Sequence, residues 1–349
     1  MSFLLNTNQA DMSLHAEPTS SAASMVTPFL PTLISQPGPP RILPTVLQTS
    51  QYLASFFPQR ARDVPWLYHE PRNARYSPAT APVARVVCSI TPTAGVYTAM
   101  HAARTPPPLV FLHRPFTLDR KRVPRGANVL SSHVGFDEVL TTGWNEALAQ
   151  RLDLYTGEDA VCIQGYKGDP DRRIGLVAAL RTPANLGAVS SRIKREFGQW
   201  DAVYGADIES ETDMAQPVTV VAIMNAFHPE EVQRVAEAAF SKGWVSDVND
   251  GNSIVYLTGQ AREPGLLAAQ EKKMKAFCVG HRSCEEWGIR YIASELRREF
   301  PLVDVCEVYE DEEPREPRKP KPDLKRNVPS SSANLPEQKR RQESDIVTI

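Results

Sequence analysis

The stretch PVTVVAIMNAFHPEEVQRVAEAAFSKG, residues 217–243, contains the pattern on which the fold prediction rests. Its first part is mostly apolar and rich in β-branched side chains, which predicts a buried strand over 217–224. Pro229 then occupies a first-turn position and Gly243 is a stop signal, so a helix is expected between these two residues. A strand followed by a helix of this length is the unit from which α/β proteins are built.

The same alternation of strands and helices extends over the region from about residue 83 to residue 309. Apolar runs predict strands over 83–90, 109–113, 127–133, 253–259, 275–281 and 302–309. Helical patterns cover 94–104, 143–154, 263–274 and 285–299. We therefore predict an α/β protein with a largely parallel or mixed sheet. The phosphate-binding patterns GxxxxGK[ST] and GxGxxG are both absent, which argues against P-loop and Rossmann sites.

The composition is that of an ordinary globular protein. The chain has 349 residues, of which 42% are hydrophobic and 23% charged, with a net charge of −2. This length allows one large domain or two modest ones. The near-neutral charge predicts no direct nucleic-acid binding, and no apolar run approaches the ~20 residues of a membrane span. The five cysteines form no CxxC pair, as expected of reduced intracellular thiols.

The two ends differ from the middle. Residues 1–50 are rich in Ser, Thr and Pro, with no basic residue before Arg41, so a transit peptide or secretory signal is poorly supported. Residues 312–349 are charged and contain few large apolar groups. We predict that both ends are disordered and that residues 51–311 form the α/β domain. The tail's RKPKPDLKR and KRR clusters are either a nuclear import signal or a solvated charged tail, so the protein is expected in the cytoplasm with the nucleus as the alternative.

Three of the seven histidines, His113, His133 and His281, end predicted strands. Ligand sites of open α/β sheets gather beyond the carboxyl ends of strands. Asp137 and Glu285 each follow one of these histidines by four residues. Imidazoles combined with carboxylates suit Zn, Mn, Fe or Co better than calcium, and two carboxylates can bridge a pair of ions. We therefore predict a site for one or two divalent transition metal ions per chain.

The same residues also allow simpler interpretations. A His-x-x-x-Glu step is common on exposed helix faces, where it contributes only tenths of a kcal/mol. Histidines at strand ends can cap loops, and Asp137 could accept hydrogen bonds from amides of the following turn.

Several blocks resemble the NGG-one-interacting-factor-three (Nif-three-like) family, whose members are also described as GTP cyclohydrolase I type 2 homologues. SSHVGFDEVLTTGWNEALAQRLDL (131–154) is similar to the family's HTxxD…GxNxxLA block. The sequence from YLTGQ to IASEL (256–296) is similar to its TGE…HxxSE block, and RRIGLVAALRTPANLGAVSSRIKREFG (172–198) resembles its hairpin and helix. The resemblance covers about 83–309, in order and with plausible spacing.

The resemblance implies a Nif-three-like mixed-sheet α/β fold, assembled into a ring-like hexamer, with a dinuclear metal centre at strand ends. His133 and Asp137 correspond to ligands of the first motif. His281 corresponds to a ligand of the second, with Glu285 as its bridging carboxylate. His113 retains one ligand position of the family's HHP strand motif.

Some family positions have changed. The HHP motif is HRP here, so Arg114 stands in place of the second histidine and would weaken a second ion or bind an anion. Val134 replaces the threonine of HTxxD, and Gln260 replaces the glutamate of TGE. The core ligand positions are retained while much around them differs, as in a divergent paralogue with an altered centre.

Three functions fit this pattern. The first is a metal-dependent hydrolase for a phosphate- or nucleotide-type substrate, with Arg114 or Arg282 orienting the anion. The second is a non-catalytic scaffold or transcription-associated regulator, because the family's name comes from association with a transcriptional coactivator. A protein partner in transcription would then be expected, while a homo-oligomer and no membrane association are expected in every case. The third is a metal carrier. Fold-level analogy does not choose among them.

Overall fold

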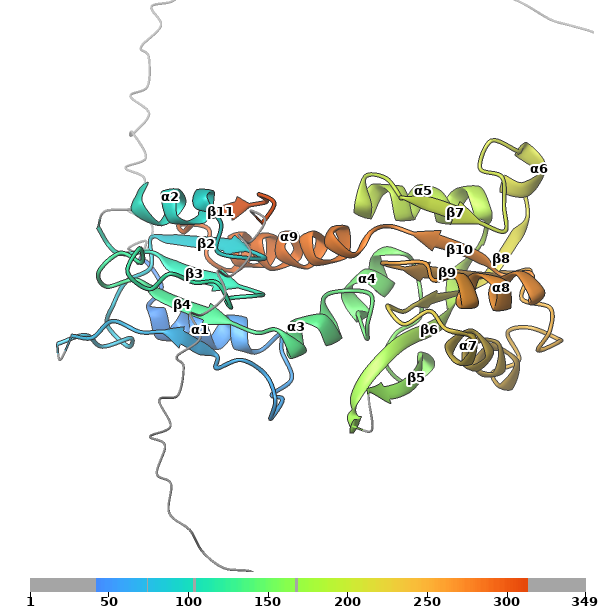
Figure 1. The fold of residues 1–349 in the computed structure, drawn as a ribbon, viewed down its shortest axis with the longest axis horizontal. Helices are drawn as coiled ribbons and strands as arrows, with labels where there is room; N and C mark the ends of the chain where they lie inside the picture. The colour runs from blue at the N-terminus through green and yellow to red at the C-terminus, as the bar shows by residue number, and fades with distance from the viewer. Residues whose placement is uncertain (1–41, 74, 103–104, 167–168, 313–349) are drawn as a thin grey trace, which may run out of the picture. The chain divides into compact units, whose positions relative to one another are not determined.

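The computed structural model describes residues 42–73, 75–102, 105–166 and 169–312 (Figure 1). Most of the two segments predicted to be disordered therefore lies outside the described residues. Helix α1 (Val46–Ala54) is an exception, because it begins within the predicted segment 1–50. Its N-terminus is a capping box in which Thr45 and Gln48 exchange hydrogen bonds. Regular structure thus begins before the boundary that was predicted at residue 51.

The first sheet is mainly parallel, with the strand order β1-β4-β3-β2-β11. Four strands run parallel, and β1 joins the edge antiparallel to β4. The bounds are β1 Leu67–His69, β2 Arg85–Ser89, β3 Leu109–Leu112, β4 Asn128–Ser131 and β11 Asp304–Val308. Because β3 and β4 are parallel neighbours, their carboxyl ends meet at one edge of the sheet.

The second sheet is mixed, with the order β5-β6-β8-β9-β10-β7. Strands β8, β9 and β10 are parallel, and the others pair antiparallel. The bounds are β5 Val161–Tyr166, β6 Asp169–Asn185, β7 Ala202–Tyr204, β8 Pro217–Ile223, β9 Ile254–Thr258 and β10 Lys275–Cys278. The predicted α/β class is confirmed, and the mixed sheet is in fact two sheets.

Helices connect most of these strands. They are α2 Ala94–Ala102, α3 Val134–Val139, α4 Glu146–Arg151, α5 Leu186–Phe197, α6 Glu211–Met214, α7 Pro229–Ser241, α8 Glu263–Glu271 and α9 His281–Glu299, together with a short 3-10 turn at Gly157–Asp159. The stretch 217–243 forms β8 and α7 as predicted, with proline in the first turn of α7. Helix α4 is shorter than predicted, because Asn145 caps its start and Asp153 takes a positive φ of 67° just after its end.

The last long helix begins earlier than its periodicity suggested. The predicted strand 275–281 ends at Cys278, and α9 starts at His281 instead of residue 285. Gly280 lies between them with a φ of 91°, a backbone conformation that residues other than glycine rarely adopt. His281 is therefore the first residue of a helix and not the last residue of a strand.

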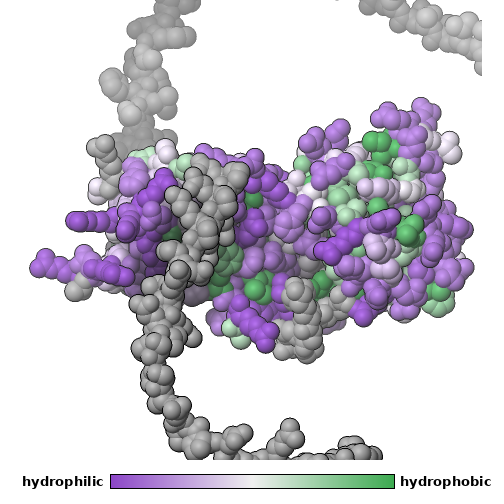
Figure 2. All heavy atoms as spheres, in the orientation of Figure 1, coloured by the Kyte–Doolittle hydropathy of each residue, from purple (hydrophilic) through white to green (hydrophobic). Residues whose placement is uncertain are grey.

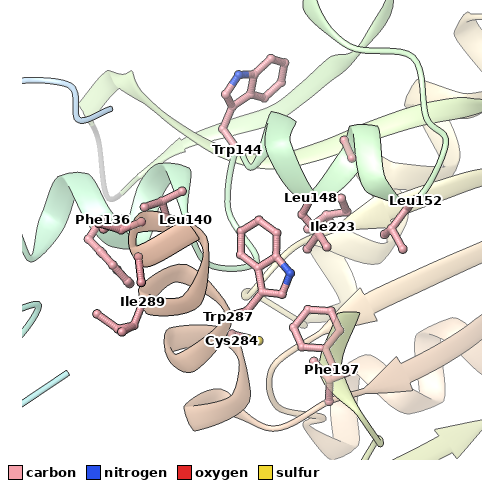
Figure 3. Packing of buried hydrophobic residues seen from close by; sticks show 14 of the residues in the cluster. Phe136, Leu140, Trp144, Leu148, Leu152, Phe197, Ile223, Cys284, Trp287 and Ile289 are labelled. Carbon is pink, nitrogen blue, oxygen red and sulfur yellow. The ribbon is translucent and has the colours of Figure 1, made fainter. Parts of the chain in front are cut away.

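One hydrophobic cluster includes residues of both sheets and of helices α3, α4, α5 and α9. Figure 3 shows Phe136 of α3 and Leu140, the residue after α3, beside Ile289 of α9, with Trp287 on another side of the same helix facing Phe197. A Cβ atom added to Gly288 would lie 2.5 Å from Phe136 Cζ, so α9 and α3 approach closely here. This packing fixes the start of α9 against the first sheet.

The described surface is mixed in character. On the face drawn in Figure 2, hydrophilic residues predominate and hydrophobic residues form smaller patches. Among the described residues, no helix combines the length and the apolar character that crossing a bilayer requires.

Candidate metal centre

The two histidines that follow β3 and β4 lie side by side at the carboxyl edge of the first sheet. The ring centroids of His113 and His133 are 4.9 Å apart. His113 is fully buried, and its ring stacks on Phe136 at 4.2 Å. Its Nδ1 lies 3.2 Å from the carbonyl oxygen of Ser132, to which it donates. In the neutral ring, Nε2 therefore carries the lone pair, which is the tautomer that a metal-binding histidine needs.

Two carboxylates flank this nitrogen. His113 Nε2 lies 3.4 Å from Asp137 Oδ1 and 3.3 Å from Glu285 Oε1. Neither contact has hydrogen-bond geometry, so Nε2 is a buried polar atom without a hydrogen-bond partner among the described residues. His133 Nδ1 lies 3.8 Å from Asp137 Oδ2 and is likewise a buried nitrogen without a hydrogen-bond partner in the described part of the chain. A buried nitrogen left in this state is costly, and a cation among these atoms would satisfy both nitrogens.

His113, His133 and Asp137 each offer one ligand atom, and these atoms lie within 4.8 Å of one another. Glu285 extends the group from the first turns of α9, and its side chain is only 2% exposed. His281 Nε2 lies 3.5 Å from Glu285 Oε1 on the solvent side. The structure thus brings all five predicted residues together. Because Glu285 is buried, the alternative of an exposed helix-face pair does not describe it.

The charges at this edge are strongly coupled. Burial alone would lower the pKa of His113, but Asp137 and Glu285 outweigh it and raise the pKa to about 9. Burial favours the neutral form of Glu285, yet His113, His281 and Arg114 hold the pKa of its carboxyl well below the usual range. Without a metal, the site therefore holds a proton on His113 at neutral pH.

Arg114 places a positive charge beside the proposed metal ligands, as its position in the HRP motif predicted. Its Nε lies 3.5 Å from Glu285 Oε1, and its Nη2 lies 3.3 Å from Glu312 Oε1. Arg282 is engaged elsewhere, with Glu286 at 2.8 Å and Asp311 at 3.0 Å. Glu285 is therefore shared between the imidazoles and a fixed guanidinium.

Asp63 is a supporting residue that lies in none of the sequence motifs. Its carboxylate accepts hydrogen bonds from the backbone amides of His133, Val134 and Gly135 at 2.8–2.9 Å. These bonds cap the start of α3 and lower the pKa of Asp63 despite its partial burial. The amides at this turn thus pair with a residue about 70 positions earlier and not with Asp137. No local pattern around Asp63 indicates this role.

We expect Asp63→Asn to destabilise the metal-free protein by about 1–3 kcal/mol, because three amides lose a charged acceptor. Urea unfolding at pH 7 measures this loss. Since the pKa of Asp63 is depressed in the folded state, its contribution is present at neutral pH and disappears as the pH falls through that value. The two proteins should therefore converge in stability as the pH falls well below 3.8, the ordinary pKa of an aspartate. A constant difference at all pH values would contradict the capping role.

A cavity of about 480 Å³ lies beside Asp137 and His281. His228 and Arg262, which precede helices α7 and α8, are part of its wall. Arg262 Nη1 donates to His228 Nε2 at 3.1 Å, and no ion pair with Arg262 is found within the described ranges. The cavity wall therefore includes members of the carboxylate and imidazole group together with an arginine that has no carboxylate partner among the described residues.

Comparisons with known proteins identify one protein family and several structures that resemble this chain. The family model Duf34/NIF3 (NGG1p interacting factor 3) matches residues 118–314. Reduced HcgD from Methanocaldococcus jannaschii has a TM-score of 0.50 at 14% identity, over 76% of this chain and 97% of that one. A Bacillus cereus protein related to NIF3 has a TM-score of 0.48 at 11% identity, over 79% and 99% of the two chains. No curated protein sequence matches this chain.

Proposed function

The chain belongs to the Duf34/NIF3 family, and we propose that it is a metal-dependent hydrolase that holds one divalent transition metal ion. His113, His133 and Asp137 would bind the ion, with Glu285 and His281 completing the group. Zn, Mn, Fe and Co all suit this mixture of nitrogen and oxygen donors. The observation that carries the proposal is the buried His113 Nε2, held in the metal-binding tautomer between two carboxylates.

The proposal of one ion instead of two rests on Arg114. Two ions sharing Glu285 would need its carboxylate to balance their charge. Here the Arg114 guanidinium already lies 3.5 Å from that carboxylate. A fixed cation at this distance opposes a second ion.

The cavity beside Asp137 and His281 is evidence for a small anionic substrate. A bound ion would supply Lewis-acid activation of a substrate oxygen. Arg262 lines the same 480 Å³ cavity and would bind a phosphate or carboxylate of the same molecule. His228 accepts from Arg262 and so orients its guanidinium. A cavity of this volume suits a nucleotide-sized molecule. We propose a phosphate- or nucleotide-type ester as the substrate class.

A second candidate is a non-catalytic scaffold or transcription-associated regulator in which the ion is structural. The contact between Arg114 and Glu285 favours this second function, because the guanidinium supplies permanently part of the positive charge that a second metal ion would supply. The homo-oligomer and the protein partner expected from the resemblance stay predictions. Turnover of a nucleotide ester that is lost in Arg262→Ala, with the metal content unchanged, would favour the hydrolase over the scaffold.

Metal binding should strengthen as the pH rises, because the ion must displace the proton from His113. With a pKa of about 9 in the metal-free protein, the apparent affinity is expected to rise about tenfold per pH unit between pH 7 and 9. Titration of chelator-treated protein with Zn²⁺ at three pH values measures this slope and the number of ions bound. An affinity independent of pH would show that His113 is not a ligand.

The metal-free protein should show the opposite trend in stability. Protonated His113 stabilises the fold below its ordinary pKa of 6.5, and this contribution is lost as the pH rises through about 9. The metal-free form is therefore expected to lose stability between pH 6.5 and 9, while the metal-bound form does not.

A further inference from the structure

A basic groove lies along β1, at the edge of the first sheet. Its volume is about 1170 Å³, and its basic residues are Arg72, Arg120, Lys121 and Arg125. All four side chains are exposed, and none forms an ion pair with a carboxylate in the described part of the chain. Glu70 is the acidic residue among those that line the groove. The groove is thus strongly positive, although the whole chain has a net charge of −2.

The loop that carries three of these cations is held in place. Backbone turns link Leu118 to Pro115 and Arg122 to Asp119. Arg120 donates to the carbonyl oxygen of Tyr68 at 3.2 Å, and its guanidinium lies 5.4 Å from the centroid of the Tyr68 ring. A preorganised arginine loses less freedom when it binds a phosphate.

Aromatic side chains lie among the cations. Tyr68 and Tyr76 both line the groove, and the Tyr76 hydroxyl accepts from Asn128 at 2.7 Å. His69 of β1 also lines the groove, and the charges of Arg120 and Arg72 add to burial in lowering its pKa. The depressed pKa of His69 is a second sign of a positive potential in the groove.

We propose that this groove binds single-stranded nucleic acid, with the four cations on phosphates and the tyrosines against bases. Cations that follow a groove and alternate with aromatic rings are the usual means of holding single strands. The groove exceeds the roughly 300–1,000 Å³ of a small-molecule pocket, so a polymer fits it better than one metabolite. Its concave shape disfavours a flat lipid surface. The near-neutral net charge predicted no nucleic-acid binding because it sums the positive charges of the groove with acidic residues elsewhere in the chain.

The test is fluorescence anisotropy of the full-length protein with a labelled 20-nucleotide oligo-dT strand. Four phosphate contacts predict a slope of about −3 for log affinity against log salt. Affinity should therefore fall roughly fifty-fold between 50 and 200 mM NaCl. The variant R72E/R120E/K121E/R125E should lose binding, and the milder R120Q/K121Q should reduce the slope by about 1.4.

The matched control is R181E/K194E/R234E/K242E, which reverses the charge of four exposed basic residues outside the groove. It changes the net charge by the same amount, from −2 to −10, since each reversal subtracts two charges from the chain. We expect this control to bind within about threefold of the wild type. Equal losses in both quadruple variants would show a general charge effect and overturn the proposal. Binding to phosphatidylserine vesicles without binding to the oligonucleotide would also overturn it, in favour of a membrane surface. Far-UV circular dichroism and thermal unfolding of R120Q/K121Q verify that this variant is folded.

Discussion

Glu285→Gln is expected to purify with little or no transition metal. The Glu285 carboxylate is 2% exposed and lies 3.3 Å from His113 Nε2 and 3.5 Å from His281 Nε2. Glutamine keeps the shape of the side chain but removes the charge that would balance a cation. Loss of a supporting residue typically costs 10–100-fold in metal affinity, and loss of a charged ligand should exceed that range. We therefore expect a drop in Zn²⁺ affinity of more than about 100-fold.

Glu286→Gln is the matched control, because it makes the same chemical change one position along α9. Glu286 pairs with Arg282 at 2.8 Å and has no contact with the imidazoles within the described residues. We expect wild-type metal content in this variant, measured by elemental analysis. Equal metal content in the two variants would remove Glu285 from the proposed site.

A readout that needs no metal is the titration of His113 by NMR. With only Asp137 left beside Nε2, the pKa of His113 in metal-free Glu285→Gln should fall from about 9 toward its ordinary value. An unchanged titration would show that Glu285 does not set the charge of this ring. The two readouts separate a failure of metal binding from a failure of the structure around the site.

Much of the fold could be predicted from sequence because strand and helix periodicities are local. The stretch 217–243 forms a strand and a helix in the structure for the reasons its prolines, glycine and apolar spacing suggest. His113 and His133 were also placed well, since parallel neighbouring strands end at the same edge. The offset of four residues between His133 and Asp137 then places His133 at the N-cap of α3 and Asp137 in the first turn of the same helix.

The remainder depends on contacts between distant parts of the chain. Asp63 caps α3 from a segment with no predicted element, so no periodicity could reveal it. The start of α9 was predicted four residues late, because the turn at Gly280 depends on its φ of 91° and not on apolar spacing. That shift moves His281 from a strand to a helix. The basic groove was missed because net charge does not record where charges lie.

The meeting of Glu285 with the first sheet depends on one glycine, so Gly288→Ala should destabilise the protein and weaken metal binding together. A Cβ at this position would lie 2.5 Å from Phe136 Cζ and 2.8 Å from the carbonyl oxygen of Leu140. The ring could rotate aside, but the backbone oxygen cannot move without shifting α3. Overpacking of this kind costs about 1–3 kcal/mol. Because Glu285 is three residues earlier on α9, the same shift changes its distance from His113.

The same substitution at Gly187 in α5 is expected to have the opposite effect. The nearest atoms to a Cβ there are at 3.4–3.6 Å, which is ordinary contact distance. Alanine in place of a helical glycine then stabilises by about 0.4–1 kcal/mol, mainly by restricting the unfolded chain. Urea unfolding and Zn²⁺ titration of both variants test this difference in sign. If Gly288→Ala left stability and metal affinity undiminished, as expected for Gly187→Ala, the close approach of α9 to α3 would not be what positions Glu285. A loss of both stability and metal affinity in Gly288→Ala alone would tie the metal centre to that helix contact.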